Sequence, residues 1–357
     1  MSNLPPSGEI PRGAIRFNTD SNKPELWDGS QWAEFQLSTP NLGRSVDTEP
    51  GARGVYGGGL KAPNKATSVT LEYLNISSTG DATSFGDLTG SNRGWIASCA
   101  SSTRGVWGAG SDNPGGSREN TIDFITFSST GDATNFGDLI DGYEGFAVAS
   151  CSNSTRGLWG SGYYPGGANV NVIQYVTIAS TGNAVDFGDL TQSRRGAAGC
   201  ASATKGLFGS GIISSSVNTI DFVTISTTGN AQDFGDLTFP TRRDGNGSCS
   251  NPIRGLWAGG YSTQPPTYTA ASGIDSVIIT SGGNAVKFGD LSQARASIGS
   301  FSSPISAVFL GDIKDVDNYG NMIDYVQFAT EGNAVDFGDL ITKKGGASGA
   351  SNAHGGL

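Results

Sequence analysis

Residue types that could carry out chemistry are scarce in this sequence. His354 is the only histidine among the 357 residues, so neither a multi-histidine metal site nor a Ser–His–Asp triad is expected. The sequence contains no Gly-x-Ser-x-Gly elbow and no phosphate-binding Gly-x-x-x-x-Gly-Lys loop. Acidic residues number 32; a pair of carboxylates can cleave a glycosidic bond, but nothing in the sequence selects a pair. We therefore expect a protein that is not an enzyme and holds no cofactor.

The four cysteines stand at one equivalent position in four successive repeats, at Cys99, Cys151, Cys200 and Cys249. A later repeat has Phe301 at that position. A zinc site needs ligands at close spacing such as Cys-x-x-Cys, and a disulfide scaffold is far richer in cysteine. The pattern therefore predicts small, buried, apolar side chains with free thiols, and no metal site.

The tetrapeptide Phe-Gly-Asp-Leu supplies a recurring carboxylate. It occurs six times, and its aspartates are Asp87, Asp138, Asp189, Asp236, Asp290 and Asp339. A residue repeated in every unit is more typical of a scaffold than of a site, so we expect these carboxylates to accept backbone N–H groups and fix the turn between repeats. The segment 315–320 resembles the start of a calcium-binding loop, but Tyr319 and Val326 stand where that loop needs oxygen ligands. We expect a solvated acidic loop there.

The spacing of the tetrapeptide defines a repeat of about 50 residues. Fourteen residues before each of its phenylalanines, an aliphatic residue opens a β-branched and aromatic run such as Ile220-Asp-Phe-Val-Thr-Ile225. Each repeat also has a glycine-flanked strand such as Arg156-Gly-Leu-Trp-Gly160, and before it a run of small residues such as 196–202. Four strand candidates per repeat of this length predict the blades of a β-propeller.

The repeats divide the sequence into six blades, at residues 41–88, 89–139, 140–190, 191–237, 238–291 and 292–340. Residues 341–357 resemble only the start of a further repeat, so we expect them to add a strand to the first blade and close the ring. The sequence thus predicts an all-β fold: a six-bladed β-propeller over residues 41–357, closed by a C-terminal strand, after a small N-terminal β-hairpin segment over residues 1–40. A seventh blade built from residues 1–40 is the alternative.

The connections between the glycine-flanked strand and the following strand differ in length, and the connection is shorter in the fourth repeat than in the fifth. Equivalent loops of a propeller emerge on one face, and Tyr and Asn on rigidly held loops are typical of recognition surfaces. The candidate recognition residues in these loops are Asn113, Arg118, Tyr163, Tyr164, Asn169, Tyr261, Gln264, Tyr268, Asp312, Asp317 and Tyr319. The alternative is that these are surface loops whose sequences have varied freely because they bind no partner.

Composition and charge limit the classes of partner. The formal charge of −10 argues against nucleic acid, whose phosphates need clustered Lys and Arg. No apolar run is long enough for a membrane-spanning helix, and the first residues do not resemble a secretory signal. We therefore expect no nucleic acid among the partners and no membrane insertion.

Residues 1–40 lack the landmarks of the repeat. The segment 13–17 alternates like a strand, and a second run returns through an Asp-Gly turn at Asp28. One or two hairpins of this size are marginal alone, so we expect the segment to attach to another surface. The candidate attachment residues are Ile15, Phe17, Leu26, Trp27 and Trp32.

Both parts of the sequence resemble structural proteins of tailed bacteriophages. The segment 13–32, which runs from Gly-Ala-Ile-Arg-Phe to Leu-Trp-Asp-Gly-Ser-Gln-Trp, is similar to a short module of tail-fibre and other virion proteins. The repeats, with Arg-Gly-Leu-Trp-Gly, Ile-Asp-Tyr-Val and Asp-Phe-Gly-Asp-Leu, resemble repeated units in virion proteins of phages, notably those that infect cyanobacteria.

This resemblance implies a non-enzymatic virion component, such as a fibre, knob or decoration, located on the virion after synthesis in the host cytoplasm. Its N-terminal segment would dock to other virion proteins, its loops would contact a host-surface glycan or protein, and the chain would form a homo-oligomer. A purely architectural adaptor or decoration that packs on other virion proteins is one alternative. A polysaccharide depolymerase is the other.

Overall fold

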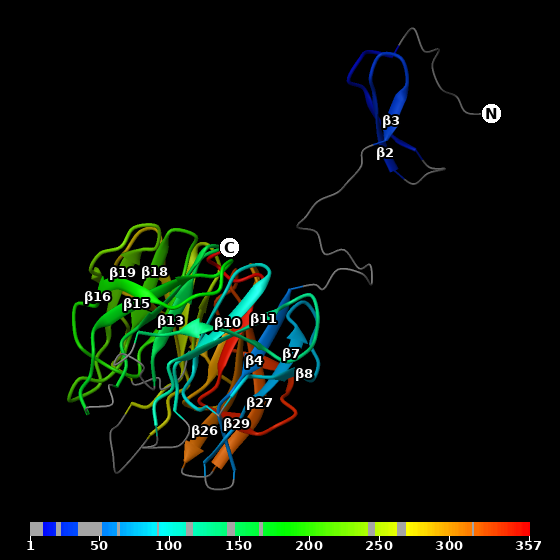
Figure 1. The fold of residues 1–357 in the computed structure, drawn as a ribbon. Coiled ribbons are helices and arrows are strands. Elements are labelled where there is room, and N and C mark those ends of the chain that lie inside the picture. Colours follow the sequence, from blue (N-terminus) through cyan, green and yellow to red (C-terminus); the bar gives the residue numbers. More distant parts are fainter. Residues whose placement is uncertain are drawn as a thin grey trace. The chain divides into compact units, whose positions relative to one another are not determined.

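The computed structural model describes residues 10–18, 23–34, 52–62, 65–90, 93–111, 117–140, 147–163, 167–241, 247–262, 269–315 and 318–357. The chain divides into two compact units, Met1–Asp47 and Thr48–Leu357. The described residues form an all-β, propeller-like fold without helices (Figure 1). The sequence prediction of an all-β class is thereby confirmed.

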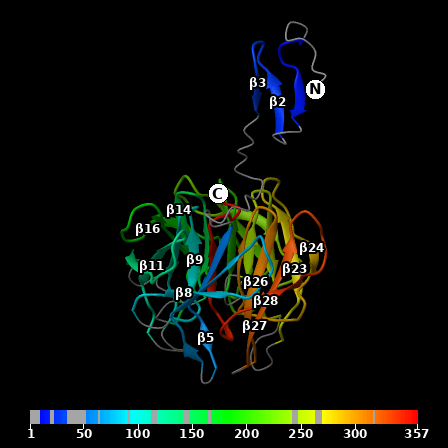
Figure 2. The same ribbon diagram turned by 90° about the vertical axis from the view of Figure 1, so that its right-hand side faces the viewer.

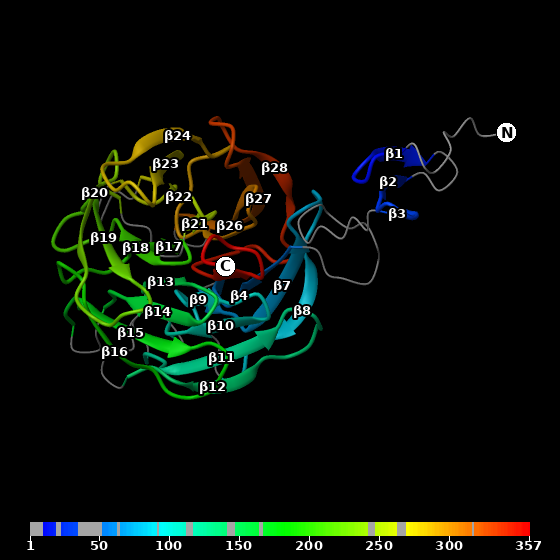
Figure 3. The ribbon, with the colours of Figure 1, turned by 90° about the horizontal axis from the view of Figure 1, so that it is seen from above.

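Six four-stranded antiparallel sheets make up most of the larger unit over the described residues, and we call each sheet a module. Seen from above in Figure 3, the sheets are arranged around a common centre, with their first strands innermost. In the order first to sixth module, the inner strands are β30 (Ser348–Ser351), β9 (Ala97–Ala100), β13 (Ala149–Ser152), β17 (Ala198–Ala201), β21 (Ser248–Ser250) and β25 (Gly299–Ser302). The second strands are β4 (Arg53–Gly57), β10 (Arg104–Gly108), β14 (Arg156–Gly160), β18 (Lys205–Gly209), β22 (Arg254–Ala258) and β26 (Ser306–Asp315).

The two remaining strands of each module lie farther from the centre (Figure 3). The third strands are β7 (Thr70–Asn75), β11 (Thr121–Thr126), β15 (Val172–Thr177), β19 (Thr219–Thr224), β23 (Gly273–Ile278) and β27 (Asn318–Gln327). The outer strands are β8 (Thr83–Asp87), β12 (Thr134–Asp138), β16 (Val185–Asp189), β20 (Gln232–Asp236), β24 (Val286–Asp290) and β28 (Val335–Asp339). The first module takes its inner strand from the far end of the sequence, because β30 pairs antiparallel with β4 from Ser348↔Gly57 to Ser351↔Gly54.

A short sheet and a long hairpin lie at one end of the larger unit. The short sheet consists of β29 (Lys344–Gly345), β5 (Leu60–Lys61) and β6 (Ala66–Thr67). The hairpin is formed by the ten-residue strands β26 and β27. Figure 2 shows β5 and β27 reaching the end of this unit opposite the C-terminus. We call this end, where the second and third strands of the modules are joined, the loop face.

A β-bulge inside each module explains the Phe-Gly-Asp-Leu motif. In the third module Ile173 pairs with Gly188 while Gln174 pairs with Asp186, so Phe187 is the extra residue. Such a bulge redirects a side chain, and Phe187 is buried with its ring in an edge-on contact to Tyr175, 5.8 Å between centroids. The same register shift between third and outer strand occurs in all six modules.

The glycine of this motif brings neighbouring modules into backbone contact. Gly188 lies against Gly229 in the hairpin of the fourth module, where a Cβ on Gly188 would collide with the carbonyl group of Gly229. Beside it, the N–H of Gly229 donates to Phe187 O at 2.7 Å and the N–H of Ala231 donates to Asp189 O at 2.7 Å. The close approach therefore requires glycine at position 188.

The aspartates of the motif act differently from the prediction. We expected their carboxylates to accept backbone N–H groups, but it is their own backbone N–H that donates to a side chain of the next module. Asp138 donates to Asn183 Oδ1 at 3.0 Å, and Asp189 donates to Asn230 Oδ1 at 3.1 Å. The capping oxygen thus belongs to the Asn or Asp of the following hairpin, because that residue follows a glycine that holds its side chain against the bulge.

In the first five modules the second strand opens with a basic residue that joins two modules. The guanidinium of Arg156 packs over the Tyr175 ring, 4.6 Å from its centroid, and donates to Ile225 O of the next module at 2.9 Å. Lys205 repeats the arrangement over Phe222, at 5.1 Å, with Ile279 O at 3.3 Å. Sequence reasoning treated this residue as part of a strand motif and did not predict its bridging contact.

The smaller unit contains one three-stranded antiparallel sheet, with β1 (Ile15–Asn18), β2 (Lys23–Trp27) and β3 (Trp32–Glu34) in that order. Trp27 is buried, with its ring 5.4 Å from that of Trp32. Arg16 donates to Glu25 at 2.7 Å and packs over the Trp32 ring at 4.3 Å. Two aromatic rings and one ion pair thus form the small core of this sheet.

Replacing Gly188 with Ala tests the contact between modules. Gly188 and Gly229 both have positive φ, 146° and 153°, but only the Cβ at Gly188 meets other atoms. We expect Gly229→Ala to lower the free energy of unfolding by about 1 kcal/mol through backbone strain alone. Gly188→Ala should lower it by about 2–4 kcal/mol, because overpacking adds to that strain. Chemical denaturation measures both, and equal losses would contradict the importance of the contact.

Candidate functional site

The inner strands surround an axial cavity of about 60 Å³. Its lining is small and polar, with serine hydroxyls that donate to backbone carbonyls of the neighbouring inner strand, such as Ser150 Oγ to Ser98 O at 2.8 Å and Ser300 Oγ to Ser248 O at 2.7 Å. Sites for small organic ligands usually measure several hundred Å³. The cavity therefore has room for a few water molecules but not for a sugar ring.

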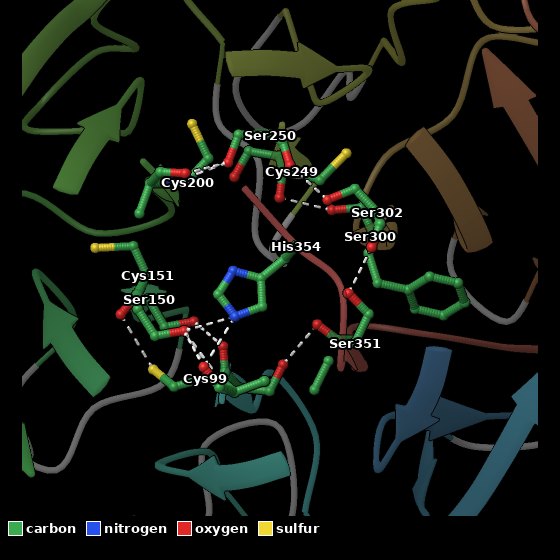
Figure 4. Close-up of a pocket in the computed structure, with 18 of the residues that line it drawn as sticks. Cys99, Ser150, Cys151, Cys200, Cys249, Ser250, Ser300, Ser302, Ser351 and His354 are labelled. Carbon is green, nitrogen blue, oxygen red and sulfur yellow. Dashed lines mark hydrogen bonds between the residues drawn. The ribbon is translucent and has the colours of Figure 1, made fainter. Parts of the chain in front are cut away.

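His354 occupies the centre of this cavity (Figure 4). Its Nε2 lies 2.8 Å from Ala100 O, and its Nδ1 accepts the N–H of Gly356 at 3.1 Å. Because a carbonyl oxygen can only accept, the hydrogen-bond network assigns the proton of the neutral ring to Nε2. Removal from water lowers the pKa of the imidazole from 6.5 to about 4.

The residues around His354 fasten the end of the chain across the axis. The N–H of Gly355 donates to Ser250 O at 2.8 Å, and the N–H of Asn352 donates to Arg53 O at 3.3 Å. A Cβ on Gly355 would collide with Asn251 O, and one on Gly356 with Ser152 O. The segment 352–357 therefore contacts several modules at once, and both nitrogens of its imidazole are used in doing so.

The four cysteines are free and buried, as the sequence predicted. Figure 4 shows the sulfur atoms of Cys151, Cys200 and Cys249 directed away from His354. The thiol of Cys151 packs where a side chain of Gly206 would stand, and that of Cys200 where a side chain of Gly255 would stand. Burial raises the pKa of the Cys151 and Cys249 thiols far above the usual range.

Buried ion pairs line the inner side of the loop face. Arg93 pairs with Asp123, Arg194 with Asp221 at 3.1 Å, Arg295 with Asp324 at 2.8 Å, and Lys344 with Glu72 at 3.2 Å. All eight side chains are at most 3% exposed. Burial lowers the pKa of the Lys344 ammonium, and the charge of Glu72 opposes that shift. These carboxylates are already engaged with cations, which suits a role in packing.

The second residue of the Ile-Asp-Phe-Val run therefore has a role that sequence reasoning missed. Asp221 also accepts the Thr191 hydroxyl at 2.6 Å, and Asp324 accepts the Ser292 hydroxyl at 2.8 Å. A charged residue in an apolar strand was the available signal, since an aspartate at that position is buried only when paired. Its partner could not be identified because it lies about 30 residues earlier in the sequence.

The structure places the candidate recognition residues in two groups. Tyr261, Asp312 and Tyr319 are buried, at 7%, 1% and 5% exposure. Tyr261 donates its hydroxyl to Ile313 O of the next module at 3.1 Å, so it joins two loops. Because their side chains are buried, these three are corrected as candidates for a freely exposed contact. Asn113, Tyr164, Gln264, Tyr268 and Asp317 lie outside the described residues, as does the side chain of Asp315.

Arg118, Tyr163 and Asn169 remain partly exposed and lie together. Tyr163 is flanked by Arg118 at 5.8 Å and by Arg195 at 4.5 Å, measured from guanidinium carbon to ring centroid. Arg195 also donates to Asn169 Oδ1 at 2.8 Å. We call these four residues the arginine–tyrosine cluster. Sequence reasoning predicted three of them and missed Arg195.

The candidate attachment residues of the smaller unit differ in exposure. Ile15 is 68% exposed, and Leu26 and Trp32 are half-buried. Trp27 is 5% exposed, so the structure corrects this candidate: its ring belongs to the core of the small sheet. Phe17 lies in β1, and its side chain is outside the described part.

Thiol labelling tests the environment of the cysteines. In native protein we expect DTNB to react with fewer than one thiol per chain over an hour, because the thiols are buried and held protonated. The same protein in denaturant should react at all four positions. Rapid labelling of native protein at near full stoichiometry would contradict the buried arrangement.

The stability of the protein should depend on pH through His354. Its folded pKa of about 4 lies below the unfolded value of 6.5, so the unfolded chain binds the proton more tightly between these values. Above pH 6.5 His354 is neutral in both states, and its contribution to stability is fully present. As the pH falls towards 4, this contribution is lost and the free energy of unfolding decreases by about 1–3 kcal/mol. Urea denaturation of wild type and His354→Gln from pH 7 to 4 measures this, with the variant lacking that component. Parallel curves would contradict it.

Comparisons with known proteins leave the interpretation to geometry and charge. A scan against protein-family models and a search of curated proteins returned no match. Within the described ranges, no helix has the length and apolar character needed to cross a membrane. The arginine–tyrosine cluster and the axial cavity are therefore interpreted from their own contacts.

Proposed function

We propose that this chain is a non-enzymatic structural protein of a tailed-phage virion, whose larger unit is a closed six-bladed propeller that presents its loop face to a host-surface glycan or protein. The closed ring is supported by three contacts between the sixth and first modules or their strands. Strand β30 pairs with β4, Lys344 pairs with Glu72, and Gly338 lies against Gly80 as Gly188 lies against Gly229. The virion assignment is supported by the resemblance of both sequence parts to phage structural proteins.

The binding role depends on one observation, the contrast between the two ends of the modules. At the hairpin end, each module repeats the same contacts with its neighbour. At the loop face, the bridges Ser111↔Arg118, Tyr163↔Asn169, Ile212↔Ser216 and Tyr261↔Ala270 enclose segments of different length and composition. A uniform scaffold that carries dissimilar loops is typical of proteins that bind through those loops.

The interior supports a non-enzymatic role. The buried carboxylates Asp221 and Asp324 are paired with arginines, and His354 uses both ring nitrogens in hydrogen bonds. The axial cavity is too small for a saccharide. In the proposed role, the small N-terminal sheet docks to other virion proteins, and many copies per particle make weak contacts effective together.

An exchange of loops tests the function. Residues 163–169 are replaced by residues 212–216 of the fourth module, whose bridge Ile212↔Ser216 corresponds to Tyr163↔Asn169. The flanking bonds also match, since Val170 donates to Gly162 O at 3.1 Å and Val217 to Gly211 O at 2.9 Å. We expect adsorption of the purified full chain to cyanobacterial cells to fall at least tenfold, because the exchange removes the exposed contacts without altering the scaffold.

A matched exchange at the opposite end serves as the control. Residues 179–183 are replaced by residues 226–230, which form the equivalent hairpin and have the same length. This variant should adsorb like wild type. Equal adsorption by all three proteins would overturn the role of this loop, and release of reducing sugar from host polysaccharide by the wild type would favour the depolymerase alternative.

A further inference from the structure

We infer that the arginine–tyrosine cluster is a subsite for the carboxylate or sulfate group of an acidic saccharide, with Arg195 as the residue that holds the anion. This inference deepens the proposed function, because it names the ligand class of the same loop face. It depends on four observations about Arg195: its place in the repeat, its charge, its unused donors and its neighbours.

Arg195 occupies a position whose residue type differs between the repeats. The bridges Gly94↔Ser111, Arg195↔Ile212 and Ala296↔Ile313 show that Gly94 and Ala296 are its equivalents in the second and sixth modules. In these two modules a small residue is sufficient here. The preceding position carries the buried arginine that pairs with a carboxylate in all three modules. Arg195 is thus an additional cation that the fold does not require.

The charge of Arg195 is not balanced by a carboxylate within the described residues. Several other basic side chains of the larger unit pair with acids, as Arg194 does with Asp221, or donate to carbonyls of the next module, as Arg156 does. Arg195 instead donates to the neutral amide oxygen of Asn169 and packs on the Tyr163 ring. In a chain with a net charge of −10, a partly exposed guanidinium held on neutral groups retains an attraction for anions.

The guanidinium also keeps donors for a ligand. Nη1 is engaged by Asn169, and Nε is buried with no hydrogen-bond partner among the described residues. Nη2 makes no hydrogen bond within that part of the chain and is not buried. Arginine donors bind carboxylate and sulfate oxygens with charge-assisted bonds of about 2.7–2.9 Å, stronger than neutral ones.

The neighbours of Arg195 suit a saccharide better than a free ion. Arg118, which belongs to the second module, adds a second positive charge beside Tyr163. Asn169 donates its amide to Ile212 O and Ile213 O, both at 3.1 Å, and so holds the loop of the fourth module alongside. Ile213 is 42% exposed and offers an apolar contact next to the cationic group. A sugar ring with an anionic substituent presents both kinds of surface.

The test compares two probes, one with charged carboxylates and one in which methyl esters replace them. Isothermal titration calorimetry measures binding of a galacturonic acid oligosaccharide and of its methyl ester to the full chain. We expect the acid to bind, with an affinity that falls as salt is raised from 50 to 500 mM, and the ester to bind at least tenfold more weakly. Equal binding of acid and ester, or no binding of the acid, would overturn the inference.

Substitutions assign the binding to Arg195. Arg195→Gln should weaken binding of the acid at least tenfold, and Arg195→Lys should restore part of it, because Lys keeps the charge but loses the planar donor pair. Lys287→Gln removes the same charge from the exposed outer strand β24 and should bind like wild type. If Arg195→Gln proves unfolded by circular dichroism, the Arg195→Lys variant decides: affinity equal to wild type would contradict the role of the guanidinium.

The inference and the proposed function can fail separately. Undiminished cell adsorption by folded Arg195→Gln, together with lost adsorption by the loop-exchange variant, would leave the binding face intact and refute the acidic-saccharide subsite. Binding of the acid by wild type without any adsorption to cells would support the subsite and refute the host-surface role.

Discussion

The close approach of backbone to backbone between neighbouring modules is the constraint on which the remaining structure depends. The bulge glycine of one outer strand lies against the hairpin glycine of the next module, and two backbone hydrogen bonds flank the contact. The arginine or lysine at the start of the second strand reinforces the same junction from the side. Because these contacts depend on backbone geometry, the modules can differ elsewhere without changing how they meet.

Because of that constraint, the sequence can vary less at the hairpin end of the modules than at the loop face. The contacts of the hairpin end are the same at every junction, whereas the loop face has buried ion pairs such as Arg295 with Asp324 at its base. Loops can therefore vary above a fixed base of charge pairs, whose disruption would leave an uncompensated buried charge at a cost of about 3–5 kcal/mol. The arginine–tyrosine cluster stands on this base and takes its residues from the second, third and fourth modules.

Much of the fold could be predicted from sequence because the modules repeat. Each strand of a module has its own sequence pattern, which indicates how far the strand lies from the centre. The patterns are the Ile-Asp-Phe-Val run of the third strand, the glycine next to Trp159 in the second strand and the small residues around Cys200 in the inner strand. The pairing partners of buried charges could not be predicted. Asp221 and Arg194 are distant in sequence, and the position of Arg194 is not an arginine in every repeat. The exposure of single loop residues could not be predicted either. Tyr261 and Tyr163 both follow a glycine in equivalent loops, but Tyr261 is buried and donates to Ile313 O of the next module, whereas Tyr163 stays partly exposed. Arg195 could have been found by aligning the repeats, because its equivalents in the second and sixth modules, Gly94 and Ala296, are small.

The junction of the sixth and first modules differs from the others in one buried contact. The ring of Phe301 fills the space beside Gly54, whereas Cys99, Cys151 and Cys200 stand in that relation to Gly157, Gly206 and Gly255. Ala307, which replaces the glycine in the sixth module, packs in the same cluster as Cys249. A large ring fits only beside glycine, so exchanging the sixth module with another would either crowd the phenylalanine or leave a void. The place of the sixth module beside the first is thus specified by a side-chain contact that the otherwise similar sheets do not share.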